Sequence, residues 1–378
     1  MSASQTRTDD TAESAASVEA TTEAPAPAEG GEPAETLAFA ESPVQLLNIL
    51  EWASATEPGG CAVVVLPPRD PTTRGQLRRM ARLARESGYQ VRWQEARGGA
   101  GAPPRTLAAL AGPLRRASRL VVGDPFSRYL QLLLSLSRPR DIVVVDDGTA
   151  TMEFVSQLAN GERLVRWHRP SSRGAAGLLF APVARRAVHR LSPAPGRVVE
   201  IFTAMPVPPL EGISVTENAF PWTRRHFGQP RVTGGADLVG TSLVETGVLR
   251  EDRYLAAVTD LAREHGVTRY WAHRRESAEK LRRLGEHAGV EVVRPDLPLE
   301  LVARRGPIGG TILSFPSTVV HTLPRVLADT EVRVLVCDLA EGWFTDRVTA
   351  RASGFLSAVT TTARGTHGLV SLPAPQQT

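Results

Sequence analysis

Short apolar runs alternate with amphipathic segments almost without interruption from residue 36 to residue 337. The apolar runs are rich in Val, Leu and Ile and show little inward–outward alternation, which is typical of strands covered on both faces. The segments between them have the spacing of helices, as crossover connections between parallel strands require. The sequence therefore predicts an α/β protein with parallel, doubly wound sheets.

The alternation occurs in two series. The first predicts strands at 36–40, 61–66, 91–94, 120–123, 142–145 and 198–203, and the second at 237–239, 268–272, 290–294, 310–314 and 332–337. Residues 161–209 are rich in Arg, Pro and Gly and are expected to be irregular before the last strand of the first series. We predict two Rossmann-like domains facing a central cleft, at 35–212 and 233–365, with a linker at 213–232 and a flexible tail at 366–378.

Residues 1–34 consist mainly of Ala, Glu, Thr, Pro and Ser without a periodic apolar pattern. Such a segment buries too little apolar surface to offset chain entropy, so we expect a disordered tail. The N-terminus is polar and acidic, and no run of about 18 apolar residues occurs in the chain. Neither a signal peptide nor a membrane span is indicated, and the expected location is the cytoplasm.

Charge and motif content exclude several classes of function. The net charge is +4, but the arginines are scattered without interleaved aromatic residues, so nucleic acid is not an expected partner. Cys61 and Cys337 lie in strand-like runs, which favours buried thiols over a disulfide or metal framework. The sequence contains no P-loop, dinucleotide fingerprint, nucleophile elbow or zinc-binding His pair.

Polar residues gather where predicted strands end, and ligands of open α/β sheets bind beyond the carboxyl ends of the strands. This rule selects two acidic residues after strand 142–145, a small donor-rich turn after 237–239, a histidine after 268–272 and two hydroxyl residues after 310–314. They are Asp146, Asp147, Gly240, Thr241, Ser242, His273, Ser317 and Thr318.

Three of these positions lie in recognisable motifs: VVVDDGTAT at 143–151, YWAHRRES at 270–277 and LSFPST at 313–318. In order and spacing they resemble the acidic-acidic-Gly, His and Ser-Ser/Thr motifs of bacterial sialyltransferases and polysialyltransferases, which are GT-B glycosyltransferases. The resemblance extends from about residue 38 to residue 344. Arg274 replaces the usual proline of the His motif, and Thr318 replaces the second serine; both substitutions keep hydrogen-bonding chemistry.

The resemblance implies inverting transfer of sialic acid, or a related nonulosonic acid, from a CMP-activated donor to a carbohydrate acceptor. Asp147 would be the general base, with Asp146 and Gly148 shaping the turn. A protonated His273 and the hydroxyls of Ser317 and Thr318 would contact the CMP phosphate. Gly240, Thr241 and Ser242 could contact phosphate too, and Glu300 resembles the carboxylate that binds the ribose. The resemblance implies neither a metal nor a cofactor besides the CMP-sugar substrate.

Each residue also has a structural interpretation. The DDG sequence is a common strand-ending turn, and its carboxylates could instead hold a divalent metal. Ser317 or Thr318 could be only a helix N-cap, and Glu300 could be only a first-turn glutamate. Gly240 to Ser242 could be an ordinary loop, and His273 a structural histidine.

Two alternatives to the leading function stay open: a GT-B transferase with another donor, such as CMP-Kdo, and a non-catalytic nucleotide-binding module. The sequence also leaves open the acceptor, which could be a glycan or a glycolipid at the inner face of the membrane. It does not determine the linkage, processivity or oligomeric state.

Overall fold

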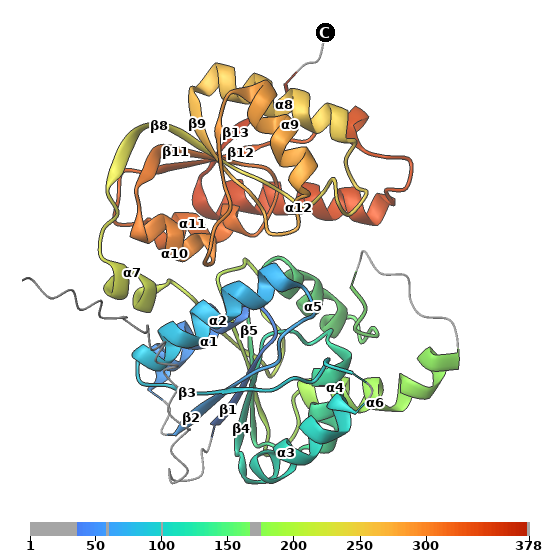
Figure 1. Cartoon of the computed structure of the whole chain (residues 1–378). Helices are drawn as coiled ribbons and strands as arrows, with labels where there is room; N and C mark the ends of the chain where they lie inside the picture. Colours follow the sequence, from blue (N-terminus) through green and yellow to red (C-terminus); the bar gives the residue numbers. More distant parts are fainter. Residues whose placement is uncertain (1–35, 58–59, 100, 167–174, 376–378) are drawn as a thin grey trace, which may run out of the picture. The chain divides into compact units, whose positions relative to one another are not determined.

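The computed structural model describes residues 36–57, 60–99, 101–166 and 175–375. Within them, two parallel β-sheets are each flanked by helices, which confirms the predicted α/β class (Figure 1). The predicted N-terminal tail, residues 1–34, lies outside the described residues.

The first sheet has seven parallel strands in the order β3-β2-β1-β4-β5-β6-β7. The order reverses beside β1, as in other doubly wound sheets. Its strands are β1 (Thr36–Ala40), β2 (Cys61–Val65), β3 (Gln90–Trp93), β4 (Arg119–Val122), β5 (Asp141–Val145), β6 (Val198–Thr203) and β7 (Ser214–Glu217).

Six helices are interleaved with these strands: α1 (Pro43–Thr56), α2 (Pro71–Glu86), α3 (Ala102–Arg116), α4 (Arg128–Leu136), α5 (Ala150–Ala159) and α6 (Ala175–Leu191). Several begin at local sequence signals. The side chains of Ser42, Asp70 and Ser127 each accept a hydrogen bond from the backbone N–H three residues later, which fixes the starts of α1, α2 and α4.

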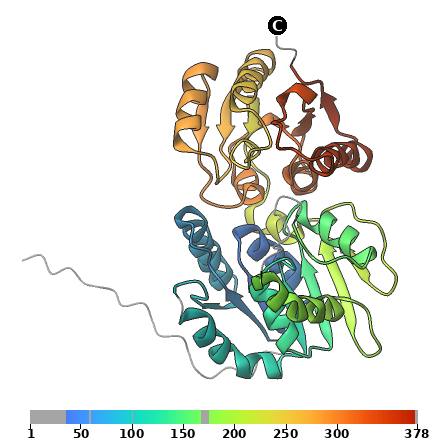
Figure 2. The ribbon, with the colours of Figure 1, turned by 90° about the vertical axis from the view of Figure 1, so that its right-hand side faces the viewer.

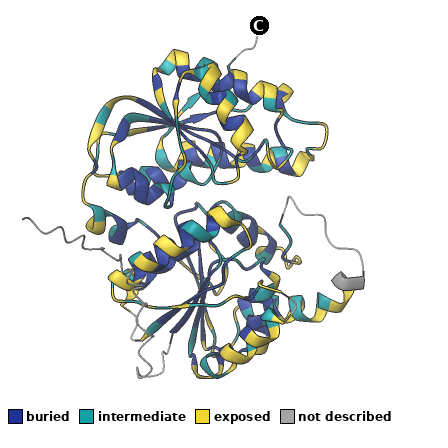
Figure 3. Ribbon diagram, viewed as in Figure 1, coloured by how far each residue is buried: buried dark blue, intermediate teal, exposed yellow. Residues whose placement is uncertain are grey.

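Successive residues of β5 enter different cores, which explains its uninterrupted apolar sequence. Val143 and Val145 belong to the core that α1 and α2 cover, whereas Ile142 and Val144 belong to the core covered by α3 to α6. Figure 2 shows helices on both sides of the sheets, and Figure 3 shows the central strands as the most buried part.

The second sheet has six parallel strands in the order β10-β9-β8-β11-β12-β13. They are β8 (Val232–Val239), β9 (Val267–Trp271), β10 (Glu291–Val293), β11 (Ile308–Ser314), β12 (Arg333–Cys337) and β13 (Val370–Leu372). The remaining helices are α7 (Pro221–Phe227), α8 (Glu251–His265), α9 (Ala278–Ala288), α10 (Leu299–Arg305), α11 (Val319–Val326), the 3₁₀ helix η1 (Glu341–Trp343) and α12 (Ala350–His367).

Three segments differ from the sequence-based expectation. The stretch expected to be irregular contains α6, although Pro182 lies inside that helix, because Ala187 and Leu191 are buried in the core against the first sheet. β7 lies within the predicted linker and pairs with β6. β13 lies within the predicted C-terminal tail and pairs with β12. In all three cases tertiary packing or pairing outweighs a weak local pattern.

The short helix α7 is held from two sides. The carboxylate of Glu51 in α1 accepts the backbone N–H groups of Trp222 (2.9 Å) and Thr223 (2.8 Å) at the start of α7. At its other end, the carbonyl of Arg224 accepts a hydrogen bond from the buried guanidinium of Arg304 in α10. Trp222 is buried in a core that contains residues of α1 as well as of α10 and α11.

Candidate active site

The two adjacent aspartates after β5 lie in different surroundings. Asp146 is buried, and its carboxylate accepts hydrogen bonds from the Thr203 hydroxyl and, at 2.6 Å, from the Ala204 backbone N–H. Burial raises its pKa to about 6, although these hydrogen bonds act in the opposite direction. Because Thr203 is the last residue of β6 and Ala204 follows it, Asp146 connects the ends of two neighbouring strands.

Asp147 is partly open to solvent, with 15% of its side chain exposed. Its Oδ1 accepts a hydrogen bond from Gln45 Nε2 at 2.9 Å, and its Oδ2 forms an ion pair with Arg166. The side chain thus combines a fixed orientation with access from outside, which is the arrangement that a general base requires.

The turn at Gly148 contacts the hydroxyl turn that follows β11. Gly148 has φ +69°, and a Cβ placed there would lie 2.2 Å from the Oγ1 of Thr318. Thr318 Oγ1 also accepts the backbone N–H of Thr149 at 3.2 Å. Only glycine combines this conformation with such a close approach. Two predicted motifs separated by about 170 residues are therefore in direct contact.

Thr318 does not cap its own helix. It occupies the N-cap position of α11, but its side chain makes no cap hydrogen bond and turns to Thr149 instead. The neighbouring Ser317 hydroxyl lies 3.2 Å from the hydroxyl of Ser314. The alternative interpretation of Thr318 as only an N-cap therefore does not hold, because its hydroxyl makes no cap hydrogen bond and has a backbone partner in the other motif.

His273 follows the carboxyl end of β9 after one residue, Ala272, and is half-buried. Burial, together with the charges of Arg274, Arg275 and Lys280, lowers its pKa to about 3. Its Nδ1 accepts the backbone N–H of Arg275 at 3.2 Å, so the proton of the neutral ring lies on Nε2. His273 is therefore neutral in the ligand-free protein, and a protonated imidazole at the CMP phosphate stays a prediction.

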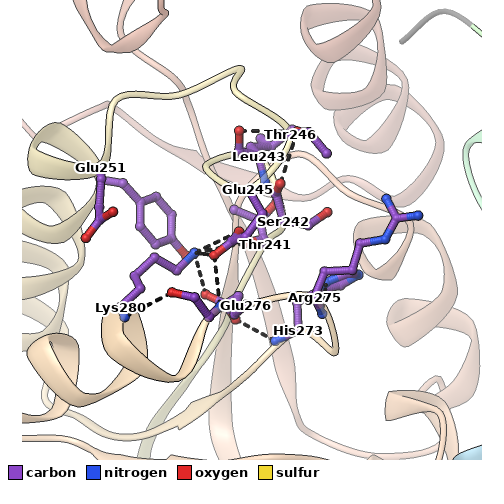
Figure 4. Close-up of polar contacts among 12 residues, drawn as sticks. Thr241, Ser242, Leu243, Glu245, Thr246, Glu251, His273, Arg275, Glu276 and Lys280 are labelled. Carbon is purple, nitrogen blue, oxygen red and sulfur yellow. Dashed lines mark hydrogen bonds and ion pairs between the residues drawn. The ribbon is translucent and has the colours of Figure 1, made fainter. Parts of the chain in front are cut away.

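A buried polar network supports the His273 loop (Figure 4). Glu276 accepts the backbone N–H of His273 at 2.5 Å and forms an ion pair with Lys280 at 2.9 Å. Lys280 is 1% exposed and also pairs with Glu245 at 2.9 Å. Its Nζ reaches the carbonyl of Thr241 as well, at 3.4 Å. One buried ammonium group thus connects the loop after β9 to the turn after β8.

Two buried tyrosines extend this network. Tyr270 donates to Glu276 at 2.6 Å, and the hydroxyls of Tyr254 and Tyr270 lie 2.7 Å apart. A Cβ at Gly240 would lie 2.3 Å from Glu276 Oε2 and 2.5 Å from the Tyr270 hydroxyl. Glycine is needed at position 240 because the network fills the space that a side chain would occupy.

The other predicted donor-site residues are less open. The Thr241 hydroxyl is buried and accepts the backbone N–H of Leu243 at 3.3 Å, whereas Ser242 is half-buried. Glu300 is only 2% exposed and accepts the Thr322 hydroxyl at 2.7 Å, linking α10 to α11. Burial raises the pKa of Glu300. The predicted contact of Glu300 with ribose stays a prediction.

Arg274, next to His273 in the loop after β9, lies close enough to Asp147 for their charges to interact. Burial lowers the pKa of its guanidinium, while the charge of Asp147 acts in the opposite direction. Since the charge interaction requires proximity, Arg274 contributes positive charge near Asp147.

Sequence reasoning missed several residues at this site. Asp124 follows β4 after one intervening glycine, so the strand-end rule used for Asp147 would also have selected it. Gln45 and Arg166 carry no local signal, because only the fold brings them to Asp147.

Among the described residues, no group of three or more His, Cys, Asp or Glu side chains is arranged to hold a metal ion. None of the helices in the described ranges has the length and apolar character needed to cross a membrane.

Comparisons with known proteins show similarity in structure alone. No protein-family model and no curated protein sequence matches the chain. An α/β-galactoside α-2,3-sialyltransferase from Photobacterium phosphoreum matches with a TM-score of 0.50 at 8% identity, over 89% of this chain and 97% of that one.

Two other solved structures are more distant. A UDP-glucosyltransferase from Polygonum tinctorium has a TM-score of 0.46 at 13% identity, over 90% of this chain and 85% of that one. A sialyltransferase from Photobacterium damsela has a TM-score of 0.42 at 12% identity, over 89% and 81%. With its two parallel sheets flanked by helices, the chain has the GT-B fold that the sequence predicts.

Proposed function

We propose that the protein is an inverting glycosyltransferase that moves sialic acid, or a related nonulosonic acid, from a CMP-activated donor to a carbohydrate acceptor. The observation that carries the proposal is the hydrogen bond between the Thr149 backbone N–H and Thr318 Oγ1, at 3.2 Å. It joins the turn that carries the candidate base, Asp147, to the turn that carries the candidate phosphate ligands.

Both turns follow strands of parallel sheets, where the ligands of this fold class bind. The fold alone does not select a chemistry, because GT-B proteins use many sugars. The choice of a CMP-linked sugar acid rests on the three motifs and on the residues that they bring to this point.

In the proposed reaction, Asp147 accepts the proton of the acceptor hydroxyl, and the acceptor oxygen bonds to the anomeric carbon of the donor. The bond from that carbon to the phosphate oxygen breaks, and CMP leaves with the electron pair. Positive charge accumulates on the sugar in an oxocarbenium-like transition state, as in glycoside cleavage. A single displacement of this kind inverts the anomeric configuration.

His273 would stabilise the leaving phosphate as a neutral donor through its Nε2–H, with the Ser317 hydroxyl and the nearby charge of Arg274. Its pKa of about 3 applies to the ligand-free site. The negatively charged phosphodiester of the bound donor would raise that pKa, and the charge that grows on the departing CMP phosphate would raise it further, because a nearby negative charge favours the imidazolium form. The ring could then pass a proton to the phosphate as the bond breaks, and we propose that no metal ion is needed.

The test is to incubate the purified full-length chain with CMP-sialic acid, CMP-Kdo or UDP-glucose and a panel of glycan acceptors, and to measure nucleotide release. We expect acceptor-dependent CMP release from the sialic acid donor that persists in EDTA. Release of CMP from CMP-Kdo alone would identify CMP-Kdo, and not CMP-sialic acid, as the donor. Release of UDP from UDP-glucose alone would contradict a CMP-binding site. Nucleotide binding without release from any donor would favour a non-catalytic module.

A further inference from the structure

Two carboxylates share one guanidinium group beside the candidate base. Arg166 forms ion pairs with the Oδ2 atoms of both Asp147 and Asp124, the latter at 3.0 Å. The side chains of the two aspartates are each 15% exposed and that of Arg166 is 22% exposed, so the three charges are largely shielded from water. Interactions between charges are stronger in such an environment than at an open surface.

The surrounding structure holds each of the three residues in place. β4 and β5 are adjacent parallel strands, so Asp124 and Asp147 emerge from the same edge of the sheet. Asp124 Oδ1 accepts the Phe126 backbone N–H at 2.9 Å, and the Arg166 guanidinium lies 5.4 Å from the centre of the Phe126 ring.

The segment before Arg166 is fixed through the side-chain amide of Gln157. This amide accepts the backbone N–H of Val165 at 2.9 Å and donates to the Val165 carbonyl at 2.7 Å. Arg166 is thus presented to the two carboxylates by an anchored backbone.

We propose that Arg166 and Asp124 are positioning residues for Asp147. Arg166 holds the Asp147 carboxylate in its orientation, and Asp124 supplies Arg166 with a second counter-ion when Asp147 takes up the acceptor proton. The inference rests on the proposed function, in which Asp147 removes the proton of the acceptor hydroxyl.

The second carboxylate, Asp124, provides an effect that a simple Arg166–Asp147 pair would lack. When the proton moves from the acceptor oxygen to Asp147, the carboxylate becomes neutral and its attraction for Arg166 weakens. A half-buried guanidinium without a counter-ion would oppose this step. Because Asp124 also pairs with Arg166, the guanidinium keeps a partner throughout, and the opposition to protonation of Asp147 is reduced.

Other charged groups face these residues from several elements. Asp146 precedes Asp147 on the same turn, and Arg274 approaches from the loop after β9. Glu41, at the end of β1, acts on the pair indirectly: it lies close enough to Asp124 for their charges to interact. Gln45, from α1, is an uncharged donor to Asp147. None of these groups bridges both aspartates as Arg166 does.

The first test is the pH dependence of kcat for full-length Arg166→Gln and Asp124→Asn, with Arg119→Gln as control. Arg119 pairs with Asp141 at 3.0 Å, also on β4 and β5 but at their opposite ends. Removing Arg166 takes the positive charge away from Asp147 and should move the acid limb of the profile to higher pH. Asp124→Asn should move it down, because Arg166 then acts on Asp147 alone. Arg119→Gln should leave it unchanged.

If Arg166 and Asp124 only stabilised the fold, both variants would lower activity without these opposite shifts. The proposal would be overturned if the acid limbs of Arg166→Gln and Asp124→Asn stayed in place or moved in the same direction. Arg166→Lys provides a second variant if Arg166→Gln does not fold: it keeps the positive charge on a different head group, and should shift the limb upward by less.

A second measurement does not depend on activity. In Arg166→Gln, the two carboxylates lose their shared counter-ion, so their mutual repulsion should destabilise the fold more as pH rises and both become negatively charged. The loss of Tm relative to the unaltered chain should be larger at pH 8 than at pH 5, and adding Asp124→Asn should reduce it. A loss independent of pH would refute the shared ion pair even if no transferase activity were found. Absence of all transfer together with this pH-dependent loss would instead count against the proposed function alone.

Discussion

Asp146 and Asp147 are adjacent in sequence, but only Asp147 has a side chain that reaches solvent. Asp146 is 1% exposed and bonded to the end of β6, whereas Asp147 keeps 15% of its side chain exposed. Adjacent residues of the same type therefore have different surroundings: Asp146 stabilises the sheet edge, and Asp147 is accessible for the base role that we propose.

Replacing Asp147 with Asn should reduce transfer by about 10²-fold or more and leave CMP binding intact, because an amide keeps the shape but cannot accept the proton. Single-turnover kinetics and calorimetric titration with CMP would separate the two effects. Asp146→Asn is the matched comparison, in which reduced thermal stability should be the main effect. Near-normal turnover in Asp147→Asn would remove this residue from the mechanism.

The protonation of His273 can be observed directly. Long-range ¹H–¹⁵N NMR spectra of the ligand-free protein at pH 7 should show a neutral ring with its proton on Nε2, because burial and neighbouring positive charge lower the pKa to about 3. Titration to pH 5 should leave the ring neutral, and saturating CMP should move its pKa upward. The His273→Gln spectrum assigns the signal, and protonation above pH 5 without ligand would contradict the description of the site.

Strand-end reasoning identified Asp147 and His273 because both follow apolar strands whose ends the sequence marks clearly. It did not identify Lys280. Glu276 and Lys280 are four residues apart near the start of α9, a spacing typical of an exposed helical ion pair, and local sequence does not reveal that this pair is buried against the turn after β8. Arg166 is hidden for a similar reason, since its position depends on how Gln157 holds the backbone.

At the level of elements, the turn between β5 and α5 is shaped by the hydroxyl that it meets. Gly148→Ala should destabilise the protein by about 1–3 kcal/mol, because the added methyl combines a positive φ with a 2.2 Å approach to Thr318 Oγ1. Thermal unfolding measures the loss.

The chain offers a matched control for that variant. Gly161 has φ +62° but no heavy atom within 4 Å of the position that a Cβ would take, so Gly161→Ala isolates the cost of the backbone conformation. Adding Thr318→Ala to Gly148→Ala should recover part of the loss. Equal costs at the two glycines would show that the contact with Thr318 carries no energy.

The sequence predicts helices and strands most accurately where a buried face imposes a clear period. The strand at 198–203 matches β6, and the other predicted strands lie within a few residues of observed ones. β13 was missed because a three-residue edge strand carries little pattern. α6 was missed because its Pro182 and its arginines argue against a helix, and its stability comes from packing on the first sheet.

At the scale of the whole molecule, α7 packs into an apolar core that elements of both sheets share. Trp222 lies in an apolar core with residues from both sheets, and Glu51 fixes the start of α7 through two backbone N–H groups. Elements of both sheets should therefore unfold together, even though each sheet has its own helical cover.

Glu51→Gln replaces one acceptor oxygen with an amide that faces a backbone N–H. The cost should be about 1–3 kcal/mol, because a buried donor loses its partner. Calorimetry should show a lower Tm or a separation of the single transition into two. Glu86→Gln, at an exposed site on α2, should change Tm little. An unaltered melting curve for Glu51→Gln would mean that α7 does not couple the two sheets.

Lys280 is the only lysine in the sequence, and it is 1% exposed in the first turn of α9. A lysine-specific protease therefore has a single site, and it can reach that site only when α9 opens and the ammonium leaves Glu245 and Glu276. Cutting there divides the chain into fragments 1–280 and 281–378, which a gel resolves. The rate of cleavage at Lys280 therefore measures how often the network that supports the His273 loop opens, and the measurement needs no label or engineered residue.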